Sequence, residues 1–409
     1  MNPFAQQGRF TNLRSVAPDH FLHSNFSVKS KYMILSPKVM IPVCVLVLAA
    51  VPGASPAVHG EDVTFFQKIV LPPKEVPPPS RPLRPLLRKR DGSPITTLEE
   101  WKPVRAEMKQ AWADFLGPLP SAAPQFDLKI LQSDIVETDG LEAVTRELIE
   151  YNAEPGRRVQ AYVLRPKAPS ATKRPGVAVF HGTTPDTSRS MVGLGTTKPG
   201  RNTGLKLAQQ GFVVICPSNY LWEESNYLKS VAAAKKRHPD SLGMATMLAD
   251  GMRAVDLLLT FPDVDSQRIG AVGHSLGGKE VLYLMAFDDR IQAGVASEGG
   301  LGLDSTNWEA PWYLEPSIKD PKFPRNHHEL LALIAPRPFL VLGGEAGRGC
   351  SDGDRSWPYL DVAQQVTKLY GIPPRQGLYN HHQGHLFSPE SQELAFEWLK
   401  RSLGPGNGK

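Results

Sequence analysis

Cysteine is scarce in this sequence, with 3 among 409 residues. Small scaffolds held together by disulfides need dense, paired cysteines, so that class of fold is excluded. Cys44 lies in an apolar stretch near the N-terminus, whereas Cys216 and Cys350 follow two well-separated predicted strands. A disulfide between the last two is compatible with an oxidising compartment, but nothing in the sequence requires it, and we expect both to be free thiols.

An excess of charge of one sign is also lacking. The formal net charge is +5, and the basic residues are scattered. Nucleic acid is therefore not an expected partner. With 41% hydrophobic and 21% charged residues, the chain has the composition of a globular protein that can bury one large core or two.

The apolar run near the N-terminus is too short to span a bilayer comfortably. Residues 39–51 (VMIPVCVLVLAAV) are preceded by lysines and followed by small residues, a pattern typical of a signal-peptide core. We expect translation to start at Met33, cleavage to fall between Ala54 and Gly60, and the rest to be exported to the periplasm or outside the cell. The alternative is a retained N-terminal membrane anchor; no other membrane contact is expected.

Proline is abundant, with 38 residues, and many of them lie between Leu71 and Pro94. Because proline blocks helix and sheet hydrogen bonds, residues 61–94 are predicted to be a linker or a surface-bound arm. Residues 1–60 form the N-terminal extension with its signal, and residues 95–409 form one catalytic domain. That domain begins with a helix from a capping box at Thr97 to about Leu116.

The hydrophobic pattern predicts an α/β fold. Three alternating runs between residues 125 and 165 are typical of antiparallel strands. After Pro175 apolar strands alternate with helices as far as a closing helix over residues 389–403. This order predicts a mainly parallel sheet with helices on both faces and antiparallel strands at its N-terminal edge. In such sheets the chemistry lies at the carboxyl ends of the strands.

The centre of the candidate site is Ser275. Residues 273–277 (GHSLG) match G-x-S-x-G, the turn that presents a nucleophilic serine between a strand and a helix. The chain order of an α/β-hydrolase requires a base just before the final helix, and His385 fits that place, with His382 as the runner-up. A metal site formed with His381 is not predicted, since no carboxylate or helix pattern completes a ligand set.

Two carboxylates qualify as the acid that orients the base. Glu298 ends the strand after Ser275, and Asp354 lies in a loop after a later strand. Either position can present a carboxylate to the far nitrogen of His385. The oxyanion hole needs two backbone N–H groups, and we expect them from Leu276 and from Thr183 in the HGTT loop. The site requires no cofactor.

Several motifs resemble known families. Residues 275–279 (SLGGK), 297–300 (SEGG) and 328–338 (HELLALIAPRP) are similar to the carbohydrate-esterase branch of the α/β-hydrolases, especially bacterial glucuronoyl esterases. The HGTT loop and residues 264–278 are more similar to acetyl xylan esterases and dienelactone hydrolases. The resemblance covers roughly residues 125–403 and implies the α/β-hydrolase fold.

The glucuronoyl-esterase pattern implies Ser275 as nucleophile, Glu298 as acid and His385 as base, and it matches Lys279 to a lysine that binds sugar hydroxyls. This sequence departs from that pattern at Leu276, where the family usually has arginine. Dienelactone-hydrolase and peptidase relatives place the acid in the later loop with proline four residues on, which matches Asp354. Both carboxylates therefore stay open.

Aromatic residues near the site are candidates for sugar binding. Trp308 and Trp312 lie in an insertion after the Glu298 strand, and Trp222 follows the Cys216 strand. Indole faces stack well on sugar rings, although the same side chains could simply bury a lid.

These features predict an exported serine carboxylic-ester hydrolase that acts on ester groups of a polysaccharide or of a small molecule. One alternative is a serine peptidase like prolyl oligopeptidase, but those enzymes usually carry a propeller, and this sequence has no repeats that would build one. Another is an inactive carbohydrate-binding protein on a hydrolase scaffold, which the candidate nucleophile, base and acids argue against.

Overall fold

The computed structural model describes residues 69–195, 202–347 and 349–404. All of them fall in one compact unit, residues 58–409. The predicted signal segment at residues 39–51 lies outside the described residues. Within the described part, no helix is both long enough and apolar enough to cross a membrane.

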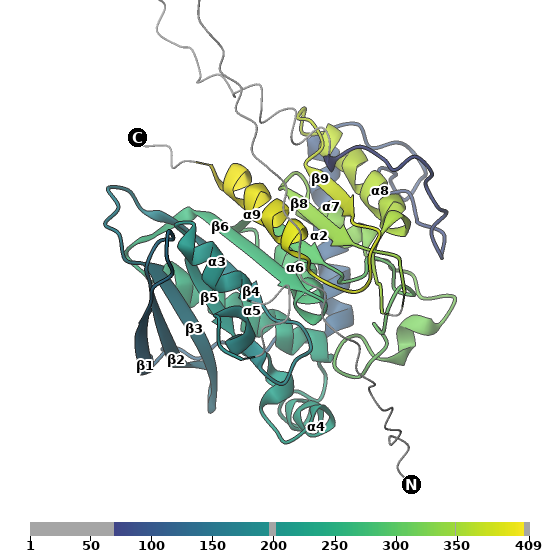
Figure 1. Ribbon diagram of the computed structural model, residues 1–409. Coiled ribbons are helices and arrows are strands. Elements are labelled where there is room, and N and C mark those ends of the chain that lie inside the picture. The colour runs from purple at the N-terminus through teal and green to yellow at the C-terminus, as the bar shows by residue number, and fades with distance from the viewer. Residues whose placement is uncertain (1–68, 196–201, 348, 405–409) are drawn as a thin grey trace, which may run out of the picture. The chain divides into compact units, whose positions relative to one another are not determined.

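A nine-stranded sheet organises this unit, with the strand order β1-β2-β3-β5-β4-β6-β7-β8-β9 (Figure 1). The pairs β1–β2, β2–β3 and β3–β5 are antiparallel, and all the others are parallel. This is the mainly parallel α/β-hydrolase sheet with an antiparallel N-terminal edge, so the predicted fold is confirmed. The strands are β1 Lys129–Val136, β2 Val144–Glu154, β3 Arg157–Pro166, β4 Arg174–Phe180, β5 Val213–Pro217, β6 Val264–His274, β7 Ile291–Ser297, β8 Phe339–Gly343 and β9 Gln376–Asn380.

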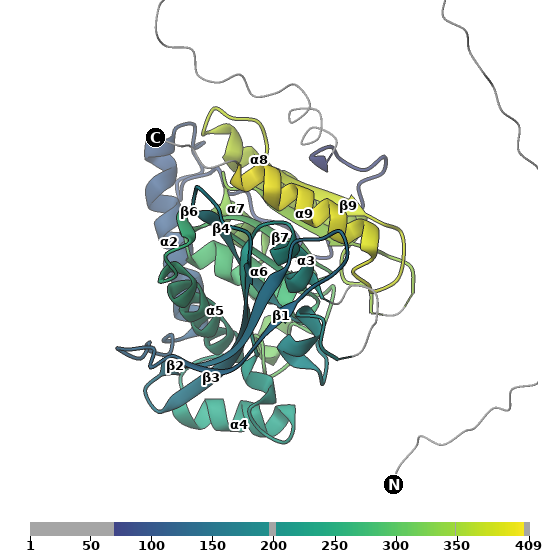
Figure 2. The same cartoon turned by 60° about the vertical axis from the view of Figure 1, so that its left-hand side comes forward.

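Helices cover both faces of the sheet (Figures 1 and 2). One buried cluster packs α3 and α9 against the sheet, and a larger cluster packs α2, α5, α6, α7 and α8 against the opposite face. The helices are α2 Leu98–Leu116, α3 Thr203–Gln209, α4 Tyr227–Arg237, α5 Gly243–Leu259, α6 Leu276–Phe287, α7 His328–Ile334, α8 Trp357–Lys368 and α9 Pro389–Leu403. Short 3₁₀ turns occupy Thr187–Met191, Tyr220–Trp222, Pro316–Lys319 and Asp354–Ser356.

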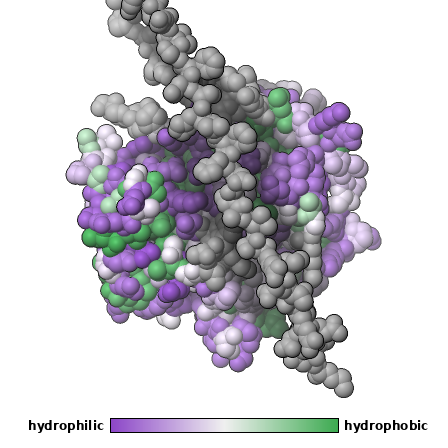
Figure 3. Space-filling model, in the orientation of Figure 1, coloured by the Kyte–Doolittle hydropathy of each residue, from purple (hydrophilic) through white to green (hydrophobic). Residues whose placement is uncertain are grey.

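Helices α3, α4 and α8 are not among the elements predicted from the sequence. Helix α4 shows the physical reason, since it buries only Ser230 and Ala234 and so has almost no apolar face. The predicted helix after Thr97 and the closing helix over residues 389–403 do form. At the β1 edge of the sheet, Ile130, Leu131 and Ile135 are exposed. Figure 3 shows an apolar area on its left, the side on which Figure 1 places β1.

The proline-rich stretch packs on the domain in its described part. Arg81 forms a bidentate ion pair with Asp304, with nitrogen–oxygen distances of 2.6 and 2.7 Å. Arg84 pairs with the fully buried carboxylate of Glu329. Through these ion pairs the described residues 69–94 contact the rest of the domain.

Candidate active site

Ser275 lies on a sharp turn between β6 and α6. Its backbone has φ 57° and ψ −113°, a conformation that residues other than glycine rarely adopt. Its N–H donates to the Ser297 carbonyl at 2.7 Å. The turn requires its glycines. A Cβ atom on Gly277 would lie 2.2 Å from the Phe180 carbonyl oxygen, and one on Gly273 would lie 2.3 Å from the backbone of Gly277. The hydroxyl is thereby presented at the carboxyl ends of the strands.

His385 reaches this hydroxyl from the loop between β9 and α9. Its Nε2 lies 3.0 Å from the Ser275 Oγ, within hydrogen-bond range. The His274 ring packs against His385 with centroids 5.0 Å apart and against Phe387 at 6.0 Å. The sequence gives His274 no role, because His385 and Phe387 lie more than a hundred residues further along the chain.

Glu298 lies on the far side of the His385 ring. Its Oε2 is 3.7 Å from His385 Nδ1, and its side chain is completely buried. The carboxylate accepts hydrogen bonds from the N–H groups of Gly344 at 2.7 Å, Ser351 at 2.8 Å and Asp352 at 3.3 Å. These donors stabilise the negative charge of the buried carboxylate. Ser275, His385 and Glu298 thus form a chain from hydroxyl to imidazole to carboxylate.

Asp354, the other candidate acid, lies elsewhere. Its carboxylate accepts from the Asn380 side chain at 2.9 Å, and its N–H points to Glu345. In the described part of the chain it forms no ion pair with His385 within 4.0 Å. Of the two carboxylates, Glu298 is therefore the one placed to orient His385.

The HGTT loop follows β4 and packs beside Ser275. A Cβ atom on Gly182 would lie 3.6 Å from the Ser275 Cβ. The His181 ring holds this loop, because its Nδ1 donates to the Gly182 carbonyl at 2.8 Å and its Nε2 accepts from the Asn219 N–H at 3.1 Å. In a trans peptide the N–H points opposite to the C=O, so this contact also fixes the direction of the Thr183 N–H.

Two cavities meet at Ser275, His385 and Thr183. The larger, about 650 Å³, is lined mainly by apolar groups that include Met191 and Phe387. The smaller is about 240 Å³ and is lined by charged, polar and aromatic side chains. Its lining includes Lys279, Glu298, Tyr227, Asn307 and Trp312. An ester bound at Ser275 can therefore extend one substituent into each cavity.

Lys279 reaches the smaller cavity from α6, four residues after Ser275. Its ammonium group donates to the Gly299 carbonyl at 2.6 Å and lies 4.0 Å from the centre of the Trp308 ring. Burial lowers the pKa of Lys279 to about 7, against the attraction of Asp352 and Glu309. This lysine is thus a partly desolvated donor beside the candidate nucleophile.

The predicted aromatic contacts are only partly placed at the cavities. Trp308 is completely buried and donates its Nε1–H to the Gly300 carbonyl, so it cannot stack on a substrate and instead supports Lys279. Trp312 lines the smaller cavity. Trp222 packs edge-on against His181 at 4.9 Å and Tyr227 at 5.0 Å, which places it behind the lining.

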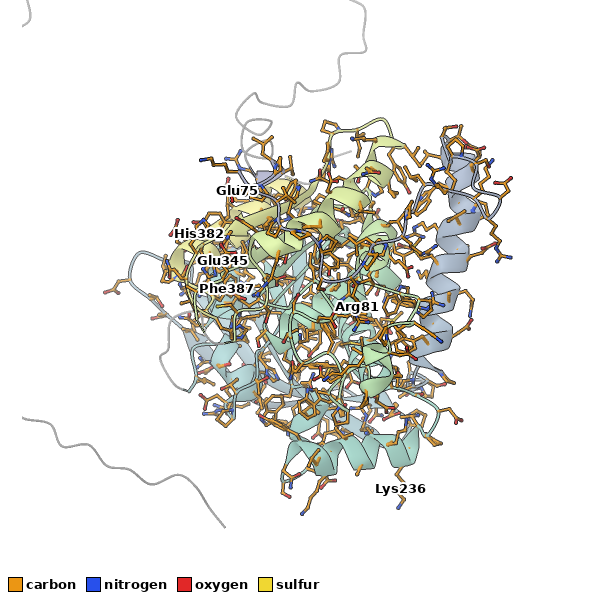
Figure 4. All side chains as sticks on the ribbon, turned by 90° about the vertical axis from the view of Figure 1, so that its right-hand side faces the viewer. Glu75, Arg81, Lys236, Glu345, His382 and Phe387 are labelled. Atoms are coloured by element: carbon orange, nitrogen blue, oxygen red, sulfur yellow. The ribbon has the colours of Figure 1, made fainter. Side chains whose placement is uncertain are left out.

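The remaining histidines of this loop point in different directions. His382 is exposed, with its Nδ1 3.3 Å from Glu345 Oε1 (Figure 4), whereas His381 is buried with its Nε2 3.5 Å from Glu298 Oε1. Within the described ranges, no group of three or more His, Cys, Asp or Glu side chains is arranged to hold a metal ion. Cys216 and Cys350 are both free thiols.

A pH dependence of stability follows from Lys279. Its folded pKa of about 7 lies below its ordinary 10.5. Between these pH values the unfolded chain binds more protons at this residue, so the free energy of unfolding rises with pH. We expect Lys279→Met to remove this contribution. Urea unfolding at pH 7 and pH 9 should show that the wild type gains more stability than the variant, and an equal gain in both would contradict the expectation.

Parts of this chain are similar in sequence to known hydrolases. Residues 159–333 match the Dienelactone hydrolase family. The 4-O-methyl-glucuronoyl methylesterase of Thermothelomyces thermophilus is 25% identical over 182 residues, which cover 36% of this chain and 43% of that protein. A hydrolase of Bacillus subtilis, YtaP, is 26% identical over 259 residues, which cover 59% of this chain and 81% of that protein. The chain spans less than half the length of the glucuronoyl methylesterases that it matches.

A solved structure of a glucuronoyl esterase from Solibacter usitatus superposes with a TM-score of 0.62 at 18% identity, covering 81% of this chain and 99% of that one. At this identity the likeness establishes the fold. The sequence matches and this fold together confirm the predicted resemblance to α/β-hydrolases of the carbohydrate-esterase branch.

Proposed function

We propose that this α/β-hydrolase is an exported serine carboxylic-ester hydrolase that removes ester groups from polysaccharide. The observation that carries the proposal is the 3.0 Å contact between His385 Nε2 and the Ser275 Oγ, with Glu298 beyond the ring. A serine hydroxyl is a poor nucleophile until a base takes its proton, and this arrangement supplies the base and its orienting acid. Export rests on residues 39–51, the signal-like run of the sequence.

The chemistry proceeds in two halves. The Ser275 Oγ attacks the ester carbonyl carbon while His385 takes the hydroxyl proton, and Glu298 stabilises the imidazolium. The N–H groups of Leu276 and Thr183 donate hydrogen bonds to the oxyanion of the tetrahedral intermediate. His385 then protonates the leaving alkoxide, and the alcohol departs. Water, deprotonated by His385, attacks the acyl-enzyme and releases the carboxylic acid and free Ser275.

The polysaccharide preference rests on the smaller cavity. Lys279 and Asn307 offer hydrogen bonds to hydroxyl groups, and Trp312 and Tyr227 offer aromatic surface to the apolar face of a sugar ring. The larger cavity, lined by Met191 and other apolar groups, accepts the other substituent of the ester.

The test is a comparison of substrates. We expect the protein to hydrolyse p-nitrophenyl acetate and at least one carbohydrate ester, either acetylated xylan or a methyl ester of glucuronic acid. A peptide p-nitroanilide, the substrate class of the peptidase alternative, should not be cleaved. Cleavage of the peptide without ester hydrolysis would replace the proposal with a peptidase, and binding without turnover would replace it with a lectin-like role.

Lys279→Met separates sugar binding from ester chemistry. At about pH 6, below its pKa of about 7, Lys279 is mostly protonated. A hydrogen bond from a charged group contributes about 1.5–3 kcal/mol, so its loss at that pH should lower kcat/KM for the carbohydrate ester roughly 10- to 100-fold, mainly through KM. The fall for p-nitrophenyl acetate, which has no sugar hydroxyls, should be much smaller. The matched control is Lys236→Met on α4, whose side chain projects into solvent (Figure 4). Equal losses for both substrates would mean that Lys279 does not contact the sugar.

A further inference from the structure

Two histidines share the carboxylate of Glu298. His385 Nδ1 lies 3.7 Å from Oε2, and His381 Nε2 lies 3.5 Å from Oε1. Both ring nitrogens are buried, and neither has a hydrogen-bond partner in the described part of the chain. Unpaired buried polar groups are rare and costly, so two of them directed at one carboxylate require an explanation.

The tautomer of His381 is set by its own loop. The Gln383 N–H donates to His381 Nδ1 at 3.1 Å, so that nitrogen is an acceptor and the proton of the neutral ring is on Nε2. The backbone continues the β8–β9 pairing, because the His381 N–H donates to the Gly343 carbonyl at 2.8 Å. The backbone and the Nδ1 atom of His381 are therefore both held by hydrogen bonds, and the remaining ring N–H lies toward Glu298.

Gly344 makes room for this arrangement. A Cβ atom there would lie 2.5 Å from His381 Cε1, too close for any side chain. The Gly344 N–H also donates to Glu298 Oε1 at 2.7 Å, the oxygen that faces His381. One backbone position thus holds the carboxylate and admits the imidazole beside it.

Burial keeps His381 uncharged. Its side chain is 1% exposed. Burial lowers its pKa below the ordinary value of 6.5, and the nearby His382 lowers it further. The carboxylates of Glu298 and Glu390 and the backbone of Leu386 act in the opposite direction. Near neutral pH the ring can donate one proton to Glu298 without forming an ion pair.

We propose that His381 is a positioning residue for the acid of the site. When substrate binds, its Nε2–H donates to Glu298 Oε1 and so holds Oε2 toward His385. The proposal rests on the proposed function, in which His385 is the base and Glu298 the acid. Shortening each contact by roughly half an ångström brings both nitrogens into hydrogen-bond range, and such contacts commonly tighten in the complex with substrate.

The shared carboxylate has a consequence for catalysis. A hydrogen bond to Oε1 restricts rotation of the Glu298 carboxyl group, so that Oε2 stays directed at His385 Nδ1. Removing the His381 donor should therefore lower kcat and leave KM nearly unchanged, because the change acts through Glu298 and not on substrate binding.

The test compares His381→Phe with His381→Gln on p-nitrophenyl acetate. Phenylalanine keeps the ring but has no N–H, whereas glutamine places an amide N–H near the position of Nε2. Both variants lack the ring nitrogen Nδ1 that accepts from the Gln383 N–H, so that loss is common to both. We expect kcat to fall roughly 10- to 30-fold in the phenylalanine variant, with KM within about twofold, because an orienting hydrogen bond is lost. The glutamine variant should stay within about threefold of the wild type.

Equal losses in both variants would show that His381 only fills space, and would overturn the proposal. If phenylalanine prevents folding, ¹H–¹⁵N spectra of the wild-type histidine rings decide instead. The proposal requires His381 as the Nε2–H tautomer, with that proton moving downfield when a boronic acid adds to Ser275, and an Nδ1–H tautomer would contradict it. A wild type without Ser275-dependent ester hydrolysis would be a failure of the proposed function instead, because the tautomer can be measured without turnover.

Discussion

Ser275→Ala is expected to reduce kcat for ester hydrolysis roughly 10⁴- to 10⁶-fold, the range found when a serine hydrolase loses its nucleophile. The reason is that, among the residues that the structure describes, the hydroxyl in contact with His385 Nε2 is that of Ser275, with Oγ at 3.0 Å. The remaining activity would come from the N–H groups of the oxyanion hole and from substrate binding. The measurement is initial rates with p-nitrophenyl acetate, at enzyme concentrations that allow a drop of this size to be quantified.

Ser190→Ala is the matched control for that variant. Ser190 lines the larger cavity, and its hydroxyl donates to the Thr187 carbonyl at 2.7 Å, so it is a buried serine of the same cavity without a base beside it. We expect less than about a fivefold change, since only one internal hydrogen bond is lost. Thermal unfolding of both variants should remain close to that of the wild type. Activity within tenfold of the wild type in Ser275→Ala would contradict the assignment.

Glu298→Gln is expected to lower kcat roughly 10³- to 10⁴-fold, as in serine hydrolases that lose the acid. Glutamine keeps the shape but removes the charge that stabilises the His385 imidazolium. It also forces an amide group among N–H donors, because the Glu298 oxygens accept from Gly344, Ser351 and Asp352.

Asp354→Asn is the comparison that decides between the two acids. The Asp354 carboxylate accepts from Asn380 and forms no ion pair with His385 in the described ranges, so we expect less than about a fivefold change in kcat. The reverse result, a large loss in Asp354→Asn and a small one in Glu298→Gln, would place the acid in the later loop, as in the dienelactone-hydrolase pattern.

Local patterns in the sequence were sufficient to predict the sheet and the nucleophile turn. The alternation of apolar runs with loops predicts β4 to β9, because buried parallel strands must be apolar on both faces. The glycines around Ser275 are visible in the sequence for a related reason, since a Cβ at Gly277 would collide with Phe180 of a neighbouring strand. These features depend on residue type and spacing.

The choice of acid and the role of the aromatic residues depend on three-dimensional contacts. Glu298 and Asp354 both follow strands, and only the path of the loops brings the first beside His385. Trp308 has the residue type of a sugar platform, yet it is completely buried under Lys279, and nothing in its sequence neighbours distinguishes it from Trp312. Nothing near His381 in the sequence indicates its contact with Glu298, because that contact requires the space left by Gly344 in another loop.

The described part of the proline-rich arm shows a similar limit. Its composition predicts little helix or sheet, since proline removes hydrogen-bond donors. Its attachment depends on Arg81 and Arg84, whose partners Asp304 and Glu329 lie more than two hundred residues further along the chain. Charge pairs of that separation leave no local pattern from which a prediction could start.

The most direct measurement of the central assignment is the mass of the protein after reaction with a fluorophosphonate, followed by peptide mapping. Such reagents phosphonylate a serine only when an adjacent base activates it. The arrangement of Ser275, His385 and Glu298 predicts one adduct, located on Ser275, that is absent from Ser275→Ala and much slower to form in Glu298→Gln. Ester hydrolysis by an enzyme that acquires no adduct, or an adduct on another residue together with loss of activity, would contradict the assignment of Ser275 as the nucleophile.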